Sequence, residues 1–119
     1  MAETVLIVDD HPGFRAAARR LLELEGYEVV GEAEDGTSAI LAARTLQPDF
    51  ILLDVQLPDL DGFEVAERLC SDPGASPQIV LTSSRDSSDY GPCLATTPAR
   101  GFVPKAELSA AGIADILAA

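Results

Sequence analysis

A chain of 119 residues with 47% hydrophobic residues can bury a core, and it is too apolar to remain disordered. Its formal net charge of −12 repels the phosphate backbone, which argues against direct binding of nucleic acid. The apolar runs are only as long as a strand and no signal-peptide pattern opens the chain, so we expect no membrane segment and a soluble, cytoplasmic protein.

The first half of the chain alternates short apolar runs with amphipathic stretches. Residues 4–8 are apolar and rich in β-branched side chains, which predicts a buried strand. Pro12 suits the first turn of a helix that Gly26 closes, with apolar residues at helical spacing between them and Arg15 on the opposite, polar side. Residues 27–34 predict a second strand, and a second helix follows with its N-cap among residues 35–38.

The next apolar run ends in a single carboxylate. Residues 50–53 lead directly into Asp54, and a loop containing Pro58 and the pair Asp61-Gly62 follows. A continuous apolar run is typical of a strand buried on both faces of a parallel sheet, so this strand should end near Asp54. A third helix is expected over residues 63–70, and a loop over residues 71–77.

The last third predicts two more strands, over residues 78–82 and 101–103. Gly91, Pro92 and Pro98 lie between them and predict a short or irregular fourth helix. A last helix is expected from Glu107 to Ala118. Five strands alternating with five helices predict an α/β fold: a doubly wound, parallel, flavodoxin-like (βα)5 sheet in one domain, residues 1–119.

Polar side chains follow four of the predicted strands. They are Asp9-Asp10, Asp54, Thr82-Ser83 and Lys105. Because the carboxyl ends of parallel strands meet at one edge of a sheet, three carboxylates, a hydroxyl and an amine should converge. Each group alone has a plain structural alternative, such as a helix cap or a solvated charge, but their joint placement favours a functional site.

The chemistry of such a cluster follows from its charge. Carboxylates held close together repel, and a hard divalent cation relieves the repulsion. Oxygen ligands favour Mg²⁺ or Mn²⁺, of which Mg²⁺ is the ion expected in a cell, and a neighbouring carboxylate can form an acyl phosphate. Lys105 and Thr82 fit the neutralisation of phosphoryl oxygens. We expect His11, just beyond the acidic pair, to be a structural neighbour rather than a metal ligand.

The same segments resemble the receiver domain of two-component response regulators, over essentially the whole chain. The matching segments are residues 8–12, 53–62, 81–83 and 101–105. The opening Asp9-Asp10-His11-Pro12 resembles the NarL/LuxR group, whose members usually carry a C-terminal helix-turn-helix DNA-binding domain.

The resemblance implies a role for each residue of the predicted cluster. Asp54 would accept a phosphoryl group from the phosphohistidine of a sensor histidine kinase. Asp10 would hold Mg²⁺ directly and Asp9 chiefly through water, together with Asp54 and the main-chain carbonyl of Gln56. Lys105 would pair with the phosphoryl group.

Further residues match positions that switch or tune receivers. Thr82 would be the switch hydroxyl, with the adjacent Ser83 as an alternative. Phe102 matches the aromatic residue that turns inward on activation, and Gln56 and Ser84 match positions that tune the lifetime of the phosphoryl group. The domain would catalyse only its own phosphorylation and dephosphorylation.

The resemblance also implies an output. The face formed by the fourth helix, fifth strand and fifth helix would switch and control homodimerisation, a partner or a DNA-binding output domain beyond Ala119, in transcriptional regulation. Two other classes stay open. An Mg²⁺-dependent phosphatase of the aspartyl-phosphate type characteristically has a second carboxylate where this chain has Gln56. A non-phosphorylated interaction module would need no complete set of Asp, Thr and Lys residues.

Overall fold

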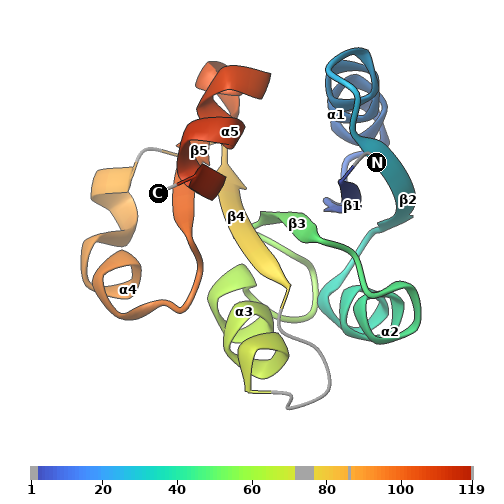
Figure 1. The fold of residues 1–119 in the computed structure, drawn as a ribbon. Coiled ribbons are helices and arrows are strands. Elements are labelled where there is room, and N and C mark those ends of the chain that lie inside the picture. The colour runs from blue at the N-terminus through green and yellow to red at the C-terminus, as the bar shows by residue number, and fades with distance from the viewer. Residues whose placement is uncertain (1–2, 72–76, 86, 119) are drawn as a thin grey trace.

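The protein is described here by a computed structural model that covers residues 3–71, 77–85 and 87–118. Its centre is a five-stranded sheet of order β2-β1-β3-β4-β5, in which every neighbouring pair is parallel (Figure 1). The strands are β1 (Thr4–Val8), β2 (Glu28–Ala33), β3 (Phe50–Asp54), β4 (Gln78–Ser83) and β5 (Gly101–Pro104). This arrangement confirms the doubly wound, flavodoxin-like fold.

Helices cover both faces of the sheet. They are α1 (Pro12–Leu24), α2 (Gly36–Leu46), α3 (Gly62–Cys70), α4 (Gly91–Thr96) and α5 (Ala110–Ala118). Helices α1 and α5 lie on one face and α2 and α3 on the other, while α4 lies beside the edge strand β5 (Figure 1). In the described part of the chain, no helix is both long and apolar enough to cross a membrane.

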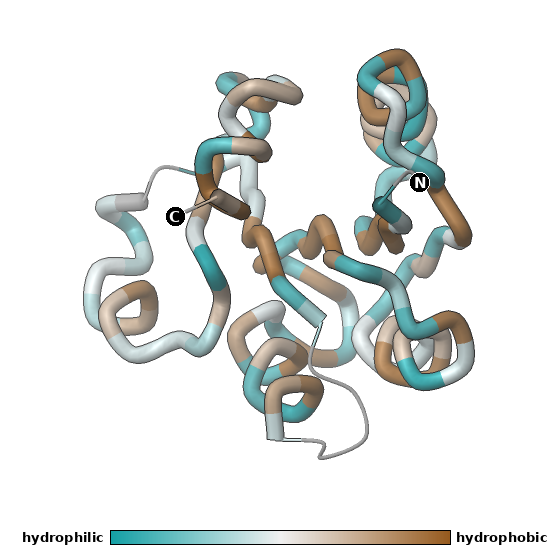
Figure 2. The backbone as a smooth tube through the Cα atoms, in the orientation of Figure 1, coloured by the Kyte–Doolittle hydropathy of each residue, from teal (hydrophilic) through white to brown (hydrophobic). Residues whose placement is uncertain are grey.

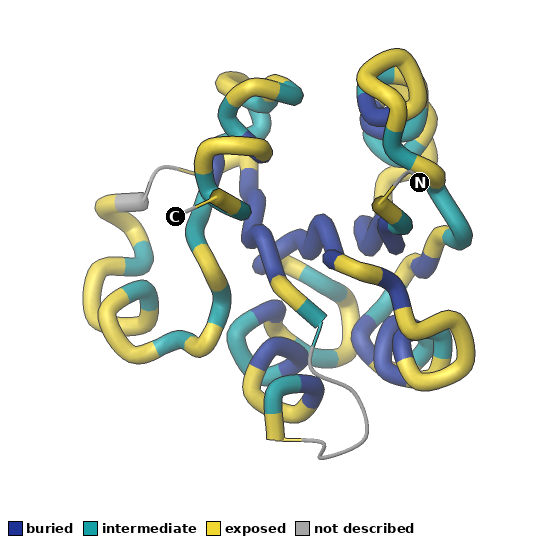
Figure 3. The backbone as a smooth tube through the Cα atoms, viewed as in Figure 1, coloured by how far each residue is buried: buried dark blue, intermediate teal, exposed yellow. Residues whose placement is uncertain are grey.

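The core has two layers, one on each face of the sheet. Every residue of β3 is buried, as the continuous apolar run predicts (Figure 3). Alternate residues of the strands pack against Ala18 and Leu22 of α1 on one face, and against α2 and α3 on the other. Hydrophobic and hydrophilic segments alternate along α2 and α3, as they do in amphipathic helices (Figure 2).

The helix boundaries agree with the sequence in most places. Asp35 caps α2 by accepting a hydrogen bond from the Ser38 N–H, as the predicted N-cap region requires. The expected irregular fourth helix is confirmed: a 3₁₀ turn (Ser87–Tyr90) precedes the short α4, which buries none of its residues. The predicted loop over residues 71–77 falls mainly on residues 72–76, which lie outside the described residues.

The predicted start of the last helix at Glu107 is wrong. Lys105–Glu107 form a separate 3₁₀ turn, and α5 begins only at Ala110. Ser109 accounts for the later start, because its Oγ accepts a hydrogen bond from the Gly112 N–H at 3.0 Å and its carbonyl accepts one from Ile113. The strand β4 also runs to Ser83, one residue beyond its predicted end.

Candidate functional site at the carboxyl edge of the sheet

Side chains at the strand ends alternate between the two faces of the sheet. Asp54 and Thr82 are register partners on β3 and β4. They continue the alternation of Leu52 and Val80, which pack in the core under α1 and α5. Both side chains therefore lie on the α1/α5 face, at the edge where the strands end.

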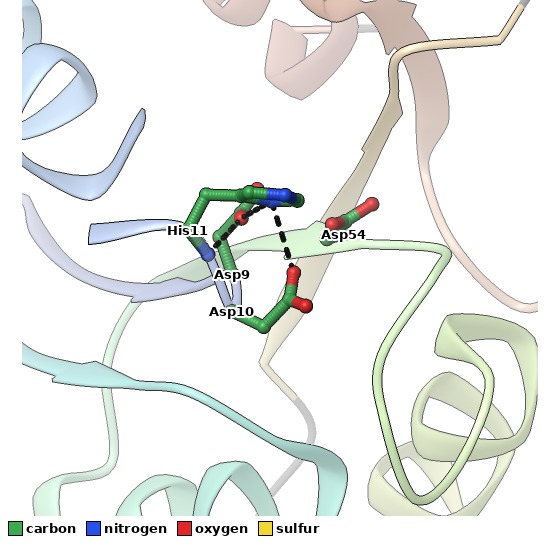
Figure 4. Close-up of side chains that lie close together, drawn as sticks. All are labelled: Asp9, Asp10, His11 and Asp54. Atoms are coloured by element: carbon green, nitrogen blue, oxygen red, sulfur yellow. Dashed lines mark hydrogen bonds and ion pairs between the residues drawn. The ribbon is translucent and has the colours of Figure 1, made fainter. Parts of the chain in front are cut away.

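Three acidic residues and a histidine gather at this edge. Asp9, Asp10 and His11 follow β1 and lie beside Asp54 at the end of β3 (Figure 4). Each offers one ligand atom, and these atoms all lie within 4.8 Å of one another. Asp9 and Asp54 are buried, whereas Asp10 and His11 are exposed. The predicted carboxylate cluster is thus assembled.

His11 is bound to both neighbouring carboxylates. Its N–H donates to Asp9 Oδ1 at 2.8 Å, and its Nδ1 lies 3.1 Å from the same oxygen and 3.0 Å from Asp10 Oδ1 (Figure 4). These contacts hold the β1–α1 turn together. The expectation that His11 is not a metal ligand stays a prediction.

Lys105 joins the two buried carboxylates. Its Nζ lies 2.6 Å from Asp9 Oδ2 and 3.4 Å from Asp54 Oδ2, and 4.4 Å from the centroid of the Phe14 ring. Only 18% of the Lys105 side chain is exposed, and none of the Asp9 side chain is. An ammonium group held between buried carboxylates offsets part of their repulsion, and the aromatic ring favours its position.

Asp54 has an unusual proton affinity for an aspartate. Burial, together with the charge of Asp9, raises the pKa of Asp54 to about 6, although a hydrogen bond from the Gln56 N–H and the nearby Lys105 oppose the rise. The Gln56 N–H donates to Asp54 Oδ1 at 3.1 Å. At neutral pH the carboxyl group is still mainly ionised, although its ionisation is costly.

The adjacent hydroxyls Thr82 and Ser83 have different surroundings. Thr82 is fully buried beside Asp54, and its Oγ1 makes no hydrogen bond to any residue that the structure describes. Ser83 points to the opposite face, where its Oγ lies 2.8 Å from the Tyr90 hydroxyl and accepts a hydrogen bond from the Arg85 N–H. This geometry favours Thr82 over Ser83 as the hydroxyl that can act on Asp54.

The remaining predicted site residues lie around this centre. Phe102 is half-buried on the same face as Ser83, and its ring centroid lies 5.8 Å from that of Tyr90, which in turn contacts Phe63. Gln56 and Ser84 are exposed. The switching role of Phe102 and the tuning roles of Gln56 and Ser84 stay predictions.

Arg15 also contacts the site, which the sequence pattern did not indicate. It was expected on the solvent side of α1, but only 17% of its side chain is exposed. Its Nη1 donates to the Asp9 carbonyl at 2.6 Å, and its Nε donates to Glu32 Oε1. Arg19 also binds Glu32, and hydrogen bonds from Arg19 and then Arg15 lower the pKa of Glu32, against the effect of burial. Arg15 lies one turn after His11, a spacing that could have indicated a return to the strand end.

The loop after β3 is drawn close to the backbone of Asp54. The Gly62 N–H donates to the Val55 carbonyl at 2.7 Å. A Cβ atom on Gly62 would lie 2.6 Å from the Asp54 carbonyl oxygen, so a side chain at this position would force the loop outward. This close approach explains why Asp61 is followed by glycine.

The cluster could hold a divalent metal ion. Three carboxylates, from Asp9, Asp10 and Asp54, face the single ammonium group of Lys105. The donors are mainly carboxylate oxygens, which are the ligands that Mg²⁺ prefers. The residues present therefore fit the predicted magnesium site.

Comparison with known proteins places the chain in a family. Residues 5–116 match the response regulator receiver domain, so the chain belongs to this family. It is 43% identical to the transcription regulator BvgA of Bordetella pertussis, covering 90% of this chain and 51% of BvgA. It is 37% identical to the DNA-binding transcriptional activator EvgA of Escherichia coli, covering 96% of this chain and 53% of EvgA.

The structural comparison agrees with the sequence match. A LuxR-family two-component response regulator from Aurantimonas superposes with a TM-score of 0.85 at 30% identity, covering 99% of this chain and 87% of that one. The resemblance to the NarL/LuxR group is thereby confirmed. The chain spans about half the length of BvgA and EvgA.

Proposed function

We propose that this chain is the phosphoacceptor receiver domain of a two-component phosphorelay. It would take a phosphoryl group onto Asp54 from the phosphohistidine of a sensor histidine kinase. The observation that supports this most is the convergence of Asp9, Asp54, Lys105 and the Thr82 hydroxyl on one face of the sheet, where that hydroxyl has no partner among the described residues. Separate helix caps and surface charges would have no reason to meet in this way.

The transfer needs little beyond positioning and charge neutralisation. An Asp54 carboxylate oxygen forms the new bond to phosphorus while the bond from phosphorus to the histidine nitrogen breaks. The electron pair of that bond stays with the histidine, which takes up a proton. Because the pKa of Asp54 is about 6, the carboxylate is already ionised at neutral pH and needs no general base.

The neighbouring side chains would stabilise the transferred group. Lys105 lies 3.4 Å from Asp54 Oδ2, close enough to pair with a phosphoryl oxygen after a small shift. Thr82 Oγ1, which makes no hydrogen bond within the described part of the chain, would donate one to another oxygen. The protein would hold Mg²⁺ with Asp10, with Asp9 chiefly through water, with Asp54 and with the Gln56 carbonyl. When bound, Mg²⁺ supplies positive charge to the phosphoryl oxygens.

Phosphorylation of Asp54 would change the structure on the opposite face of β4 and β5. Movement of Thr82 toward a phosphoryl group would shift the conformational equilibrium of β4 and α4. Phe102 packs against Tyr90 in this region. The resulting change in the α4-β5-α5 face would control homodimerisation or a partner. Polar, exposed Gln56 and Ser84 leave a water free to hydrolyse the acyl phosphate.

The output is proposed to be transcriptional regulation in the cytoplasm. BvgA and EvgA are transcription regulators about twice the length of this chain, so a DNA-binding output domain would lie outside it. The net charge of −12 argues against nucleic-acid binding by the receiver domain itself. No observation favours a phosphatase, because Gln56 occupies the position where a second carboxylate would be expected.

The first prediction tests Asp54 as the acceptor. Wild type and the variants Asp54→Asn and Asp115→Asn are incubated with acetyl phosphate and Mg²⁺, and phosphorylation is followed by intact mass. We expect wild type and Asp115→Asn, which changes an exposed carboxylate, to gain a phosphoryl group, and Asp54→Asn to gain none. Equal phosphorylation of the two variants would contradict the assignment. Multiple turnover of a phosphomonoester would support the phosphatase instead.

A further inference from the structure

Two carboxylates cap the N-terminus of α2 from different parts of the chain. Asp35, directly before the helix, accepts hydrogen bonds from the Ser38 N–H at 2.8 Å and the Ser38 hydroxyl at 2.6 Å. Asp59 lies in the loop between β3 and α3, yet its Oδ1 accepts from the Gly36 N–H at 2.7 Å. Its Oδ2 accepts from the Thr37 N–H at 3.0 Å and the Thr37 hydroxyl at 2.7 Å. The free N–H groups of the first turn are therefore shared between a local cap and a distant one.

The distant cap belongs to the loop that carries the candidate metal ligand Gln56. The ends of this loop have contacts of their own: the Gln56 N–H donates to the side-chain Oδ1 of Asp54, and the Gly62 N–H donates to the Val55 carbonyl. Gln56 also pairs with Asp61 in an isolated antiparallel bridge. The tip of the loop, around Asp59, is attached instead to α2. The position of the tip thus depends on contacts outside the loop.

Packing supports the same attachment. Leu60 lies against the backbone of Gly36, where a Cβ atom would come within 2.8 Å of the Leu60 Cβ atom. Glycine at the start of α2 allows the loop to approach closely enough for Asp59 to reach the helix N–H groups. The apolar contact and the hydrogen bonds act between the same two segments.

The Asp59 carboxylate is well suited to hold the β3–α3 loop against α2. The Thr37 hydroxyl and then the Gly36 N–H hold the pKa of Asp59 well below its usual range. The group therefore stays ionised at physiological pH. An ionised acceptor makes stronger hydrogen bonds than a neutral one, and the N-terminus of a helix favours negative charge.

We propose that Asp59 is a positioning residue for the magnesium site: by tying the tip of the β3–α3 loop to α2, it reinforces the placement of the Gln56 backbone, which the loop's own contacts also hold. This inference rests on the proposed function, because it takes the Gln56 carbonyl as a ligand of Mg²⁺. Asp59 itself lies outside the ligand set. Residues that orient metal ligands typically change metal affinity by about ten- to a hundredfold when they are replaced.

The test compares Asp59→Ala with Asp35→Ala. Both variants remove one carboxylate and one cap from the same helix terminus, but only Asp59 belongs to the loop. Calorimetric titration of each full chain with Mg²⁺ alone should give an affinity about tenfold weaker for Asp59→Ala. Asp35→Ala should retain the wild-type affinity within about twofold, although its thermal midpoint falls.

A third variant separates the tie from general stability. Asp59→Asn keeps a carbonyl oxygen for the Gly36 N–H but places an amide group toward Thr37, so its Mg²⁺ affinity should lie between wild type and Asp59→Ala. This variant also serves if Asp59→Ala fails to fold. An unchanged affinity in the Asp59 variants, or an equal loss in Asp35→Ala, overturns the inference.

A second measurement keeps this inference separate from the proposed function. If wild type shows no saturable Mg²⁺ binding, the proposed magnesium site fails. Amide hydrogen exchange without Mg²⁺ still tests the tie. Asp59→Ala should accelerate exchange of the Gln56 and Gly62 N–H groups, which Asp35→Ala should leave unchanged. Unchanged protection of these N–H groups from exchange in Asp59→Ala would show that the loop keeps its conformation without the contact to α2.

Discussion

The two faces of the sheet differ most at the end of β4, where Thr82 and Ser83 are neighbours in sequence. On the α1/α5 face, the Thr82 hydroxyl is buried without a hydrogen-bond partner among the described residues, beside a carboxylate whose pKa is raised. On the opposite face, Ser83 binds Tyr90, which packs between Phe63 and Phe102. One face keeps polar groups unsatisfied, and the other satisfies them.

This difference indicates that the α1/α5 face carries the chemistry and that the opposite face supports the fold. An unpaired buried hydroxyl costs about 1–3 kcal/mol, and two buried carboxylates around one ammonium group also oppose folding. Such costs commonly mark functional sites, where the groups are arranged for a ligand rather than for the resting fold. The satisfied face then provides the rigid support. Substitutions on the two faces should therefore separate activity from stability.

The largest effect is expected from Lys105→Ala. Removing the ammonium group leaves Asp9 and Asp54 without their shared cation, and it removes a partner for the phosphoryl group. Phosphorylation by acetyl phosphate, measured by intact mass over time, should slow by about a hundredfold or more. Arg20→Ala removes the same charge from an exposed position of α1 and should leave the rate unchanged. A wild-type rate in Lys105→Ala would remove Lys105 from the mechanism.

The next effect concerns the stability of the active face. The pKa of Asp54 is about 6 in the folded protein and 3.8 in a free aspartate, so the folded state binds more protons between these values. The free energy of unfolding therefore falls as the pH rises through this window. Asp54→Asn removes the ionisation and should raise the free energy of unfolding by about 3 kcal/mol at pH 7.

Urea unfolding in EDTA, compared across pH, checks this prediction. The advantage of Asp54→Asn should be complete above the folded pKa of about 6 and should disappear below 3.8. Asp115→Asn should show no such dependence. A destabilised Asp54→Asn variant at neutral pH would mean that the carboxylate contributes to folding rather than opposing it.

A smaller effect is expected on the supporting face. Ser83→Ala removes the partner of the Tyr90 hydroxyl and the acceptor of the Arg85 N–H. The free energy of unfolding should fall by about 1 kcal/mol, the typical net contribution of a hydrogen bond at a half-buried residue such as Tyr90. Phosphorylation by acetyl phosphate should continue at the wild-type rate. A large loss of rate would place Ser83 in the chemistry and weaken the separation of the two faces.

The last prediction is a gain in stability for Thr82→Val. Valine keeps the shape of threonine and removes a buried hydroxyl that has no partner among the described residues, so the free energy of unfolding should rise by about 1 kcal/mol. The response should be lost, however. Beryllofluoride with Mg²⁺ should shift the amide resonances of α4 and β5 in wild type and leave them in place in Thr82→Val. A full response in the variant would show that switching does not pass through Thr82.

The sequence predicts the parts of this site that depend on strand ends. Apolar runs that stop at Asp9, Asp54, Thr82 and Lys105 fix where the strands end, and parallel topology then brings those ends together. Pro92 and Pro98 likewise predict the short α4, because proline is tolerated in the first turn of a helix but cannot continue one. These signals are local, so one sequence is enough to read them.

Contacts between distant segments could not be predicted in the same way. Asp59 and Gly36 are 23 residues apart, and no spacing rule connects a loop aspartate with a helix terminus. Arg15 was expected in solvent because its helical position is polar, but its long side chain reaches the Asp9 carbonyl. The late start of α5 also depends on a weak signal, the capping of Gly112 by Ser109. Only the folded arrangement decides among such alternatives.

The most direct test of the account is a crystal structure of the protein with beryllofluoride and Mg²⁺. Beryllofluoride bound to Asp54 would stand in for the phosphoryl group. The account predicts that Thr82 Oγ1 and Lys105 Nζ lie within about 3 Å of its fluorine atoms, in hydrogen-bond range. If either side chain points away from the bound group, or if beryllofluoride does not bind Asp54, the proposed phosphoryl chemistry is contradicted.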